Sequence, residues 1–346
     1  MSYIEEILAI HFDEKFGSRF WLDVKKTLSF DPCQEIKSRD GFHLLGPMNV
    51  EALRRRPLLD FIPKCLHNEL PGMILSETGG TTGTPCRRVF LADEFTQAFL
   101  DPWSRAAQKR GFPMQAAWLF IGPSGPHIIG QAARAMSRKV GSLECFSVDC
   151  DVRWFKKQAP DSLGATLYLD HVMDQALNII DTQNIEVLFT TPPLLRILRK
   201  RISEEQRRII RGIHLGGTRL DSEEYQRINE QDFPQAVLLP GYGNSLSGVA
   251  FEDSEAAPGS PPVYHIDDPA LWMQIIPDSI GNTASALERT QPPGVQGRIV
   301  LHRLDKSFMI VNLLERDMAR YVDSNQDRIT GVTSRKESIP HATGLY

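Results

Sequence analysis

Residues 76–86 read SETGGTTGTPC, and three glycines and four threonines fill the seven positions from Thr78 to Thr84. The stretch lies between the apolar run GMIL (72–75) and the segment RRVFL (87–91). Glycine lets backbone N–H groups turn toward a ligand, and threonine hydroxyls add neutral donors. The stretch therefore predicts a loop that holds an anion.

Two common phosphate-binding patterns do not fit this loop. The P-loop needs GxxxxGK[ST], and the stretch supplies neither the lysine nor its spacing. The GxGxxG pattern of dinucleotide-binding folds is also missing from it. A backbone anion nest with hydroxyl donors remains, which suits a polyphosphate that must be held and released.

Beyond the loop, short apolar runs alternate with segments of helical period. Buried strands that end in glycine or proline are expected at 116–123, 185–193, 213–217 and 236–243. Helices are expected at 127–141, 170–183 and 194–202, with the segment 204–212 behind the last of them. This alternation predicts an α/β fold with mainly parallel sheets flanked by helices. In such folds ligands gather at the carboxyl ends of the strands.

The pattern changes after about residue 255. The tract EDSEAAPGSPP (252–262) is rich in proline and acid, and GRIVLHRL (297–304) and SFMIVNLL (307–314) resemble strands of an antiparallel sheet or small barrel. We therefore expect α/β subdomains over about 1–254 and a small β-barrel-like subdomain over about 255–330.

Composition excludes several classes of protein. The chain of 346 residues has a formal net charge of −4, which gives no electrostatic reason to expect nucleic acid as a partner. No segment approaches the ~18 apolar residues of a membrane helix, and the acidic N-terminus lacks the features of a signal peptide. The five cysteines show no CxxC pairing, which suits a reducing compartment. These features predict a soluble cytoplasmic protein with no membrane partner and no metal cluster.

Four stretches, in order along the chain, resemble motifs of the adenylate-forming superfamily, which includes acyl-CoA and aryl-CoA ligases. TGGTTGTP (78–85) resembles the phosphate-binding loop, and IHLGGTRLD (213–221) the segment that passes beside the adenine. LPGYGNSLSG (239–248) resembles the Tyr-Gly-x-Thr/Ser-Glu motif, and 297–322 the segment that ends in a ribose-binding aspartate. The resemblance implies the large N-terminal domain of these enzymes over residues 1–330.

The resemblance also implies a role for each motif. The phosphates of ATP would be held by Thr78, Gly79, Gly80, Thr81, Thr82, Gly83 and Thr84. The adenine and ribose would contact Gly216, Gly217, Thr218, Gly241, Tyr242, Gly243, Asn244, Ser245 and Asp317. The acyl substrate would lie near Gly122, Ser124 and His127.

Three of these residues have a structural alternative. Tyr242 sits between glycines, so its ring can face a purine, but it can equally be a core tyrosine. Asp317 offers acceptors for two vicinal hydroxyls, or it is a surface carboxylate paired with Arg316 or Arg320. His127 lies between a strand end and a helix start, where it either borders the acyl pocket or caps the helix.

The chain departs from the family pattern at three places. Cys86 stands where the loop has a lysine, so positive charge is displaced to Arg87 and Arg88. Leu246 stands where a glutamate helps to hold Mg²⁺, and leucine cannot bind a hard cation; Glu252 is a possible substitute. The sequence ends soon after Asp317, so residues 331–346 are expected to be a remnant of the hinge and the C-terminal lid domain to be missing, which would make the enzyme slow without a partner.

These features are most similar to the phenazine antibiotic biosynthesis proteins, a group related to phenylacetate-CoA ligases. The resemblance implies ATP-dependent activation of an aromatic carboxylic acid, such as a phenazine carboxylate, to acyl-AMP with release of pyrophosphate. Mg²⁺ would accompany ATP, and no catalytic residue is certain. A downstream reductase, thiol or carrier would receive the acyl group, and a homodimer is compatible with the sequence.

Two other functions stay open at this stage. The missing lysine and glutamate also fit a degenerate synthetase that binds nucleotide without catalysis. A serine hydrolase is the second alternative, because GNSLSG approaches the GxSxG pattern around Ser245, with His127, His214 and His265 as available bases. Ser247 stands where that pattern needs its second glycine.

Overall fold

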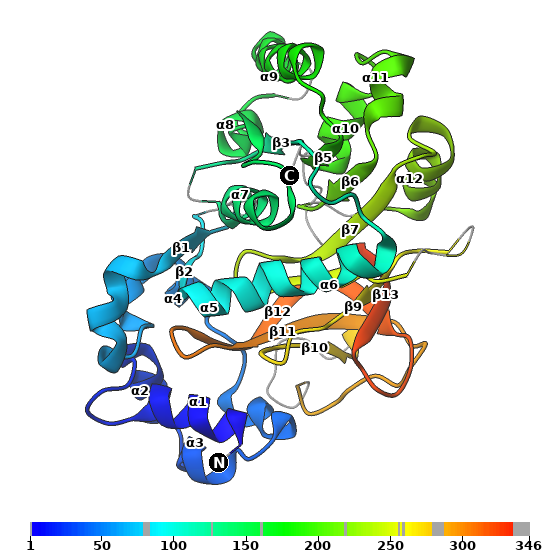
Figure 1. Cartoon of the computed structure of the whole chain (residues 1–346). Coiled ribbons are helices and arrows are strands. Elements are labelled where there is room, and N and C mark those ends of the chain that lie inside the picture. Colours follow the sequence, from blue (N-terminus) through cyan, green and yellow to red (C-terminus); the bar gives the residue numbers. More distant parts are fainter. Residues whose placement is uncertain are drawn as a thin grey trace.

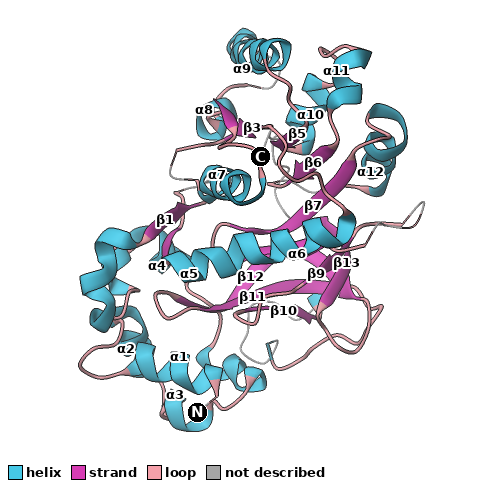
Figure 2. Ribbon diagram, in the orientation of Figure 1, coloured by secondary structure: helices cyan, strands magenta, loops and turns pink. Residues whose placement is uncertain are grey.

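A mixed eleven-stranded sheet with the order β10-β11-β12-β13-β9-β8-β7-β6-β5-β3-β4 runs through the protein. The computed structural model describes residues 2–78, 84–125, 127–159, 162–217, 220–254, 257, 260–278 and 287–334. Figures 1 and 2 show the α/β part of the chain at one end, the N-terminal helices at the other, and the antiparallel strands between them.

One half of the sheet is parallel. Its strands are β3 (Trp118–Gly122), β4 (Phe146–Asp149), β5 (Val187–Thr190), β6 (Gly212–Leu215) and β7 (Val237–Asn244). They lie in the order β4-β3-β5-β6-β7, each parallel to its neighbours. Their carboxyl ends therefore meet at one edge, as expected from the glycines and prolines that follow them.

Helices cover both faces of this half. They are α5 (Ala92–Phe95), α6 (Asp101–Arg110), α7 (Ile128–Val140), α8 (Val152–Lys156), α9 (Leu163–Thr182), α10 (Pro192–Leu198), α11 (Glu204–Ile209) and α12 (Ser222–Arg227). Side chains of β3 alternate between the two faces: Trp118 and Phe120 pack with α6 and α7, and Leu119 and Ile121 pack with α9 and α10. Burial on both faces explains why β3 is apolar throughout and confirms the predicted α/β class.

The other half of the sheet is antiparallel. Its strands are β8 (Gly248–Glu252), β9 (Val263–His265), β10 (Leu271–Ile276), β11 (Gly297–Leu304), β12 (Met309–Tyr321) and β13 (Arg328–Ser334). β7 joins the halves, because it is parallel to β6 as far as Pro240 and antiparallel to β8 from Gly241 onward. The predicted subdomain boundary near residue 255 stays a prediction.

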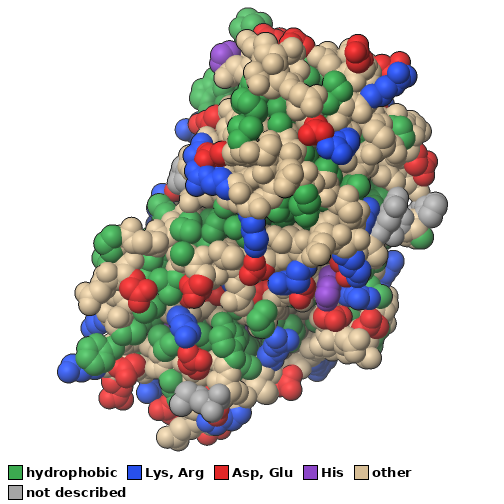
Figure 3. Space-filling model, viewed as in Figure 1, with side chains coloured by type: hydrophobic (Ala, Val, Ile, Leu, Met, Phe, Trp, Pro, Cys, Tyr) green, Lys and Arg blue, Asp and Glu red, His purple; other side chains and the backbone are tan. Residues whose placement is uncertain are grey.

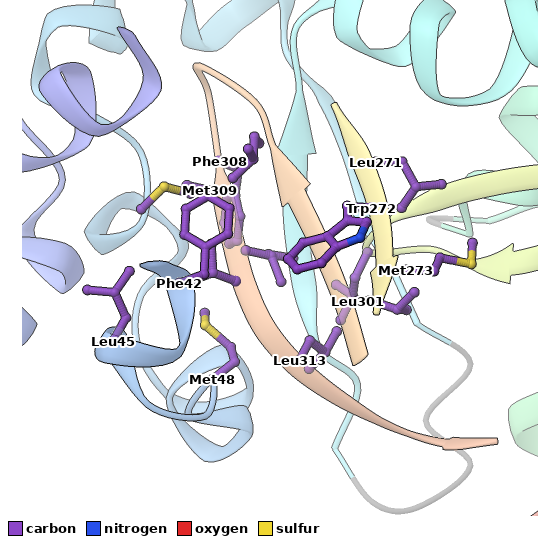
Figure 4. Packing of buried hydrophobic residues seen from close by; sticks show 14 of the residues in the cluster. Phe42, Leu45, Met48, Leu271, Trp272, Met273, Leu301, Phe308, Met309 and Leu313 are labelled. Carbon is purple, nitrogen blue, oxygen red and sulfur yellow. The ribbon is translucent and has the colours of Figure 1, made fainter. Parts of the chain in front are cut away.

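The N-terminal helices pack on the antiparallel half. They are α1 (Tyr3–Phe12), α2 (Arg19–Lys25), α3 (Pro32–Glu35) and α4 (Val50–Arg55), together with 3-10 segments at Arg39–Leu45, Leu58–Asp60 and Lys64–Gly72. Two π-helical segments lie further along the chain, at Thr96–Leu100 and Ile228–Asp232. Ser2 and Glu5 close a capping box at the start of α1. In the core below, the His302 ring stacks on both Phe42 and Trp272, with ring centroids 5.6 and 4.3 Å away. Figure 4 shows Phe42 and Trp272 among the buried side chains of this core.

A separate hairpin carries the Gly/Thr loop. Its strands are β1 (Ile74–Glu77) and β2 (Arg87–Phe90), which pair antiparallel with Glu77 opposite Arg87. Arg88 of β2 is fully buried and donates to the Asp305 carboxylate at 2.6 Å. Arg303 of β11 binds the same carboxylate at 2.8 Å and also Asp268. This ion network fixes the hairpin to the antiparallel half, since a buried charge is tolerated only when paired.

Three boundaries differ from expectation. The helix predicted at 170–183 begins earlier, at Leu163, because Ser162 caps it. Pro192 and Pro193 end the strand as predicted but also begin α10, where their fixed φ suits the first helical turn. β12 continues to Tyr321, well past the predicted strand. None of the helices in the described ranges is long and apolar enough to cross a membrane.

Candidate functional site

The base of the Gly/Thr loop is closed by two hydrogen bonds. The Thr78 N–H donates to the Cys86 carbonyl at 3.0 Å, and the Cys86 N–H donates to Thr78 Oγ1 at 3.0 Å. Thr84 is exposed beyond this closure. The predicted phosphate ligands Gly79, Gly80, Thr81, Thr82 and Gly83 lie outside the described residues. The structure therefore defines the neck of the loop and the groups around it.

Arg87 and Arg88, the two residues expected to replace the charge of the loop lysine, differ in burial and in their partners. Arg88 donates to the Leu246 carbonyl at 2.6 Å and lies 3.7 Å from the Phe90 ring centroid, and burial lowers its pKa to about 10. Arg88 is therefore a structural residue, and its predicted role as a displaced loop cation is wrong. Arg87 remains partly exposed and donates to the Glu77 carboxylate at 3.2 Å.

The turn between β7 and β8 lies against the hairpin. Ser76 Oγ of β1 donates to the Ser245 carbonyl at 2.7 Å. The Asn244 side-chain oxygen accepts from the Leu246 N–H at 2.9 Å and from the Ser247 N–H at 3.0 Å, which fixes the turn. These contacts bring the predicted phosphate loop and the Tyr-Gly motif together, although 169 residues separate Ser76 from Ser245.

Tyr242 and Asp317 meet in the antiparallel half of the sheet. The Tyr242 hydroxyl on β7 donates to the Asp317 carboxylate on β12 at 3.2 Å. The Tyr242 ring is half-buried with its centroid 5.7 Å from that of Tyr264, and burial followed by the charge of Asp317 raises the pKa of its hydroxyl. The predicted adenine-binding and ribose-binding residues thus lie next to each other.

A second carboxylate, which sequence reasoning missed, lies beside Asp317. Glu315 is two residues earlier on β12, in the stretch where the pairing of β12 with β11 is irregular. Asn244 Nδ2 donates to its carboxylate. Burial, and then the charge of Asp317, raises the pKa of Glu315 to about 7. Because the pairing of β12 is irregular here, no local pattern in the sequence would have found Glu315.

The glycines of the Tyr-Gly motif are packed against β8. A Cβ on Gly241 would come within 2.8 Å of Phe251 and Val249, and one on Gly243 within 2.0 Å of the Gly248 carbonyl oxygen. No larger residue fits at Gly243 without moving β8. The two glycines therefore set the close packing that places Tyr242 opposite Asp317.

The predicted adenine segment begins at the carboxyl end of β6. The Gly216 N–H donates to the Thr190 carbonyl at 3.2 Å, and Gly217 has a φ of +82°, which favours glycine. Thr218 lies outside the described residues. A cavity of about 400 Å³ opens where this segment continues, with walls that include Leu220, Tyr264 and Arg320.

The predicted acyl-pocket residues surround the carboxyl end of β3. Gly122 ends the strand, and the Ser124 N–H and Oγ donate to the Asp149 carboxylate at 2.7 and 2.8 Å. His127 is buried and precedes α7, and its backbone forms a parallel bridge with Glu77 at the loop neck. His127 therefore lies beside the base of the Gly/Thr loop, while Gly122 and Ser124 lie at the carboxyl end of β3 that leads to it.

The expected metal position is apolar. The Leu246 side chain is buried in the hydrophobic core. Glu252, considered as a substitute ligand, is buried at the far end of β8, where Arg110 and the Tyr225 hydroxyl bind it at 2.7 and 3.0 Å. That position does not support a role in metal binding. Within the described ranges, no group of three or more His, Cys, Asp or Glu side chains could hold a metal ion.

Two of the histidines considered for a serine hydrolase are held elsewhere. His214 is a buried residue of β6, its Nδ1 lies 2.8 Å from the Leu239 carbonyl on β7, and burial lowers its pKa to about 4. His265 lies between the carboxylates of Asp253 and Asp327 at 3.3 and 3.8 Å. These contacts argue against either as a base for Ser245.

Solved structures of acyl-CoA ligases share this fold. A 2-hydroxyisobutyryl-CoA ligase in complex with 2-HIB-AMP and CoA is 15% identical with a TM-score of 0.70, over 96% of this chain and 66% of that one. An open conformation of the same ligase gives a TM-score of 0.69 at 14% identity, over 97% of this chain and 74% of that one. An ATP-bound RpMatB–BxBclM chimera gives a TM-score of 0.50 at 14% identity, over 75% of this chain and 47% of that one.

The chain thus shares the fold of these solved ligase structures, and it spans about two thirds of the length of the 2-hydroxyisobutyryl-CoA ligase. No protein-family model matches the sequence. No curated protein matches it either.

Proposed function

We propose that the protein binds ATP and a carboxylic acid and joins them as an acyl adenylate, with release of pyrophosphate. One observation carries the proposal: Tyr242 and Asp317, 75 residues apart in sequence, are in contact at 3.2 Å. They lie in a fold shared with a ligase solved with an acyl-AMP. An aromatic ring beside a carboxylate suits a nucleoside, because the ring covers the base and the carboxylate accepts from the ribose hydroxyls.

The reaction is a displacement at the α-phosphorus. A carboxylate oxygen of the acid forms a bond to this phosphorus, and the bond to the bridging oxygen of pyrophosphate breaks. Positioning and charge neutralisation supply most of the catalysis in such phosphoryl transfers. In our proposal the β and γ phosphates lie at the Gly/Thr loop, and the acid lies near Gly122, Ser124 and His127.

Mg²⁺ would enter with the triphosphate, whose oxygens are the ligands that it prefers. The buried Leu246 offers it no ligand, so we assign no protein ligand to the metal. When bound, the ion neutralises charge on the phosphates, while the protein groups orient the nucleotide.

The substrate class rests on the sequence resemblance alone. We propose an aromatic carboxylic acid, of which a phenazine carboxylate is one example, and transfer of its acyl group to a downstream reductase, thiol or carrier. A cytoplasmic location and a homodimer stay predictions.

Acid-dependent exchange of pyrophosphate into ATP tests the proposal. We expect exchange only when a suitable acid is present. Asp317→Asn should weaken AMP and ATP binding by about tenfold to a hundredfold, because charged hydrogen bonds to the ribose are lost. Unaltered nucleotide binding by this variant would overturn the assigned site.

The alternative is a degenerate synthetase that binds nucleotide without catalysis. Cys86 and Leu246, which occupy the family's lysine and glutamate positions, are both buried, which favours this alternative. It predicts tight binding of ATP or AMP that is sensitive to Asp317→Asn, together with no exchange for any acid.

A further inference from the structure

A buried carboxylate at the loop neck holds two arginines. Glu77, the last residue of β1, has a side chain that is only 7% exposed. It accepts from Arg87 Nε of β2 at 3.2 Å and from Arg153 Nη1 of α8 at 2.8 Å. Arg153 lies 76 residues further along the chain. The two guanidinium groups thus come from different elements to one carboxylate.

This cluster lies between the phosphate loop and the predicted acyl pocket. Glu77 and Arg87 form the last paired position of the hairpin before the loop, and Glu77 bridges His127 on the side of β3. β1 reaches toward α7, where the Gln131 side chain donates to the Leu75 carbonyl at 2.9 Å (Figure 1). Any anion at the loop neck would therefore lie near both guanidinium groups.

The arginines retain capacity for another acceptor. Their side chains are 46% and 39% exposed, for Arg87 and Arg153 respectively. A guanidinium carries five N–H donors in a fork that fits phosphate oxygens. Arg153 also lies 3.8 Å from Asp151, which is itself about half exposed. The two arginines are balanced by the carboxylates of Glu77 and Asp151, so the neck offers guanidinium N–H donors to an anion with no formal excess of charge.

We propose that Arg87 and Arg153 form the cationic part of the triphosphate site, in place of the lysine that Cys86 replaces. This inference rests on the proposed function. Arg153 would contact the β and γ phosphates and stabilise the charge that develops on the departing pyrophosphate. Glu77 is a positioning residue, which keeps the two guanidinium groups at the neck before the nucleotide binds.

The test compares ligands with and without the phosphate tail. ATP, AMP and inorganic pyrophosphate are titrated by calorimetry into the full chain and into Arg153→Met. We expect ATP and pyrophosphate to bind about tenfold to a hundredfold more weakly to the variant, while the AMP affinity stays within about twofold. Arg153→Lys should recover part of the loss, because it keeps the charge without the fork.

Two further variants separate charge from structure. Arg138→Met on α7 removes an exposed arginine that pairs with Glu144, and it should leave all three affinities unchanged. Glu77→Gln keeps both arginines but leaves one acceptor oxygen in place of two to hold them, so ATP should bind more weakly than to the unaltered protein while the AMP affinity stays within about twofold. An equal loss of ATP and AMP affinity in Glu77→Gln would show that the cluster acts structurally and would overturn the inference.

The outcomes distinguish this inference from the proposed function. Equal weakening of ATP and AMP in Arg153→Met, or no change in either, overturns the inference and leaves the nucleotide site in place. Failure of the unaltered protein to bind ATP and AMP overturns the proposed function. If the unaltered protein binds pyrophosphate but neither nucleotide, and Arg153→Met abolishes pyrophosphate binding, the anion site stands without the nucleotide. If the unaltered protein does not bind pyrophosphate either, the inference fails as well.

Discussion

At the scale of single residues, the contact between Tyr242 and Asp317 defines the candidate site. The hydroxyl donates to one carboxylate oxygen, which turns the carboxylate and holds the ring on the side of β12. A half-buried tyrosine with a hydrogen-bonded hydroxyl combines an apolar face with a fixed orientation. The contact is therefore compatible with both roles considered for Tyr242, a core tyrosine and a ring that faces a purine, because the ring packs in the core and also borders the site.

Glu315 makes stability depend on pH. Its pKa is about 7 in the folded protein against 4.5 for the isolated group, so the folded state binds the proton more tightly. The stabilisation of the folded state by this proton is complete below about pH 4.5 and is lost as the pH rises through 7. The free energy of unfolding should fall by roughly 2–3 kcal/mol over this range. Glu315→Gln keeps an acceptor for Asn244 and should remove this loss, which urea unfolding at pH 5 and pH 8 measures.

The matched control is Glu205→Gln at an exposed position of α11. It should leave the difference between the two pH values as in the unaltered protein. An equal fall in stability between pH 5 and pH 8 in Glu315→Gln and the unaltered protein would contradict the raised pKa of Glu315.

Sequence reasoning found Tyr242 and Asp317 but missed Glu77, Glu315 and Arg153. Tyr242 and Asp317 lie in motifs whose residue types already indicate a nucleotide. The others act through contacts between distant elements, such as the 76-residue separation of Glu77 and Arg153, which no local pattern reveals.

At the scale of elements, β7 carries the site because it changes partner within its length. Its first part lies in the parallel sheet, and its second part pairs with β8. The change occurs between Pro240 and Gly241, next to the glycines that let β8 approach closely. The strand thus delivers Tyr242 from the parallel half to β12 in the antiparallel half.

Gly243→Ala should damage this element. Its Cβ would lie 2.0 Å from the Gly248 carbonyl oxygen, so β8 must shift, at a cost of about 1–3 kcal/mol. Thermal unfolding should show the loss, and ATP should bind more weakly because Tyr242 moves. Gly72→Ala, with nothing within 4 Å of the added atom, is the control and should change stability by less than about 0.5 kcal/mol. A Gly243→Ala variant as stable as this control would contradict the packing described here.

The elements that sequence reasoning placed best were those with strong local patterns. The strand 297–304 and the helix before Gly141 match their predicted bounds closely. β12 was predicted too short, because its second part, from Glu315 to Arg320, is largely polar and half-buried. That part is a strand because it pairs with β13, and pairing is not visible in one segment.

At the scale of the whole molecule, the buried ions between β2 and β11 and the turn contacts at Ser245 hold the hairpin in place. Because of them, the loop neck, β3, β7 and β12 converge although they come from all parts of the chain. Acidic and basic side chains are interspersed over the face shown in Figure 3. Interspersed charges give this face no long-range electrostatic field of one sign, so recognition of the nucleotide depends on the contacts within the site.

Direct detection of an acyl adenylate tests the central claim. The protein is incubated with ATP, Mg²⁺ and a panel of aromatic and fatty acids, and the products are analysed by mass spectrometry. The account predicts the mass of an acyl-AMP with at least one class of acid, and loss of that product in Asp317→Asn. No acyl-AMP with any acid, from protein shown to bind ATP, would contradict adenylation and leave the nucleotide-binding alternative.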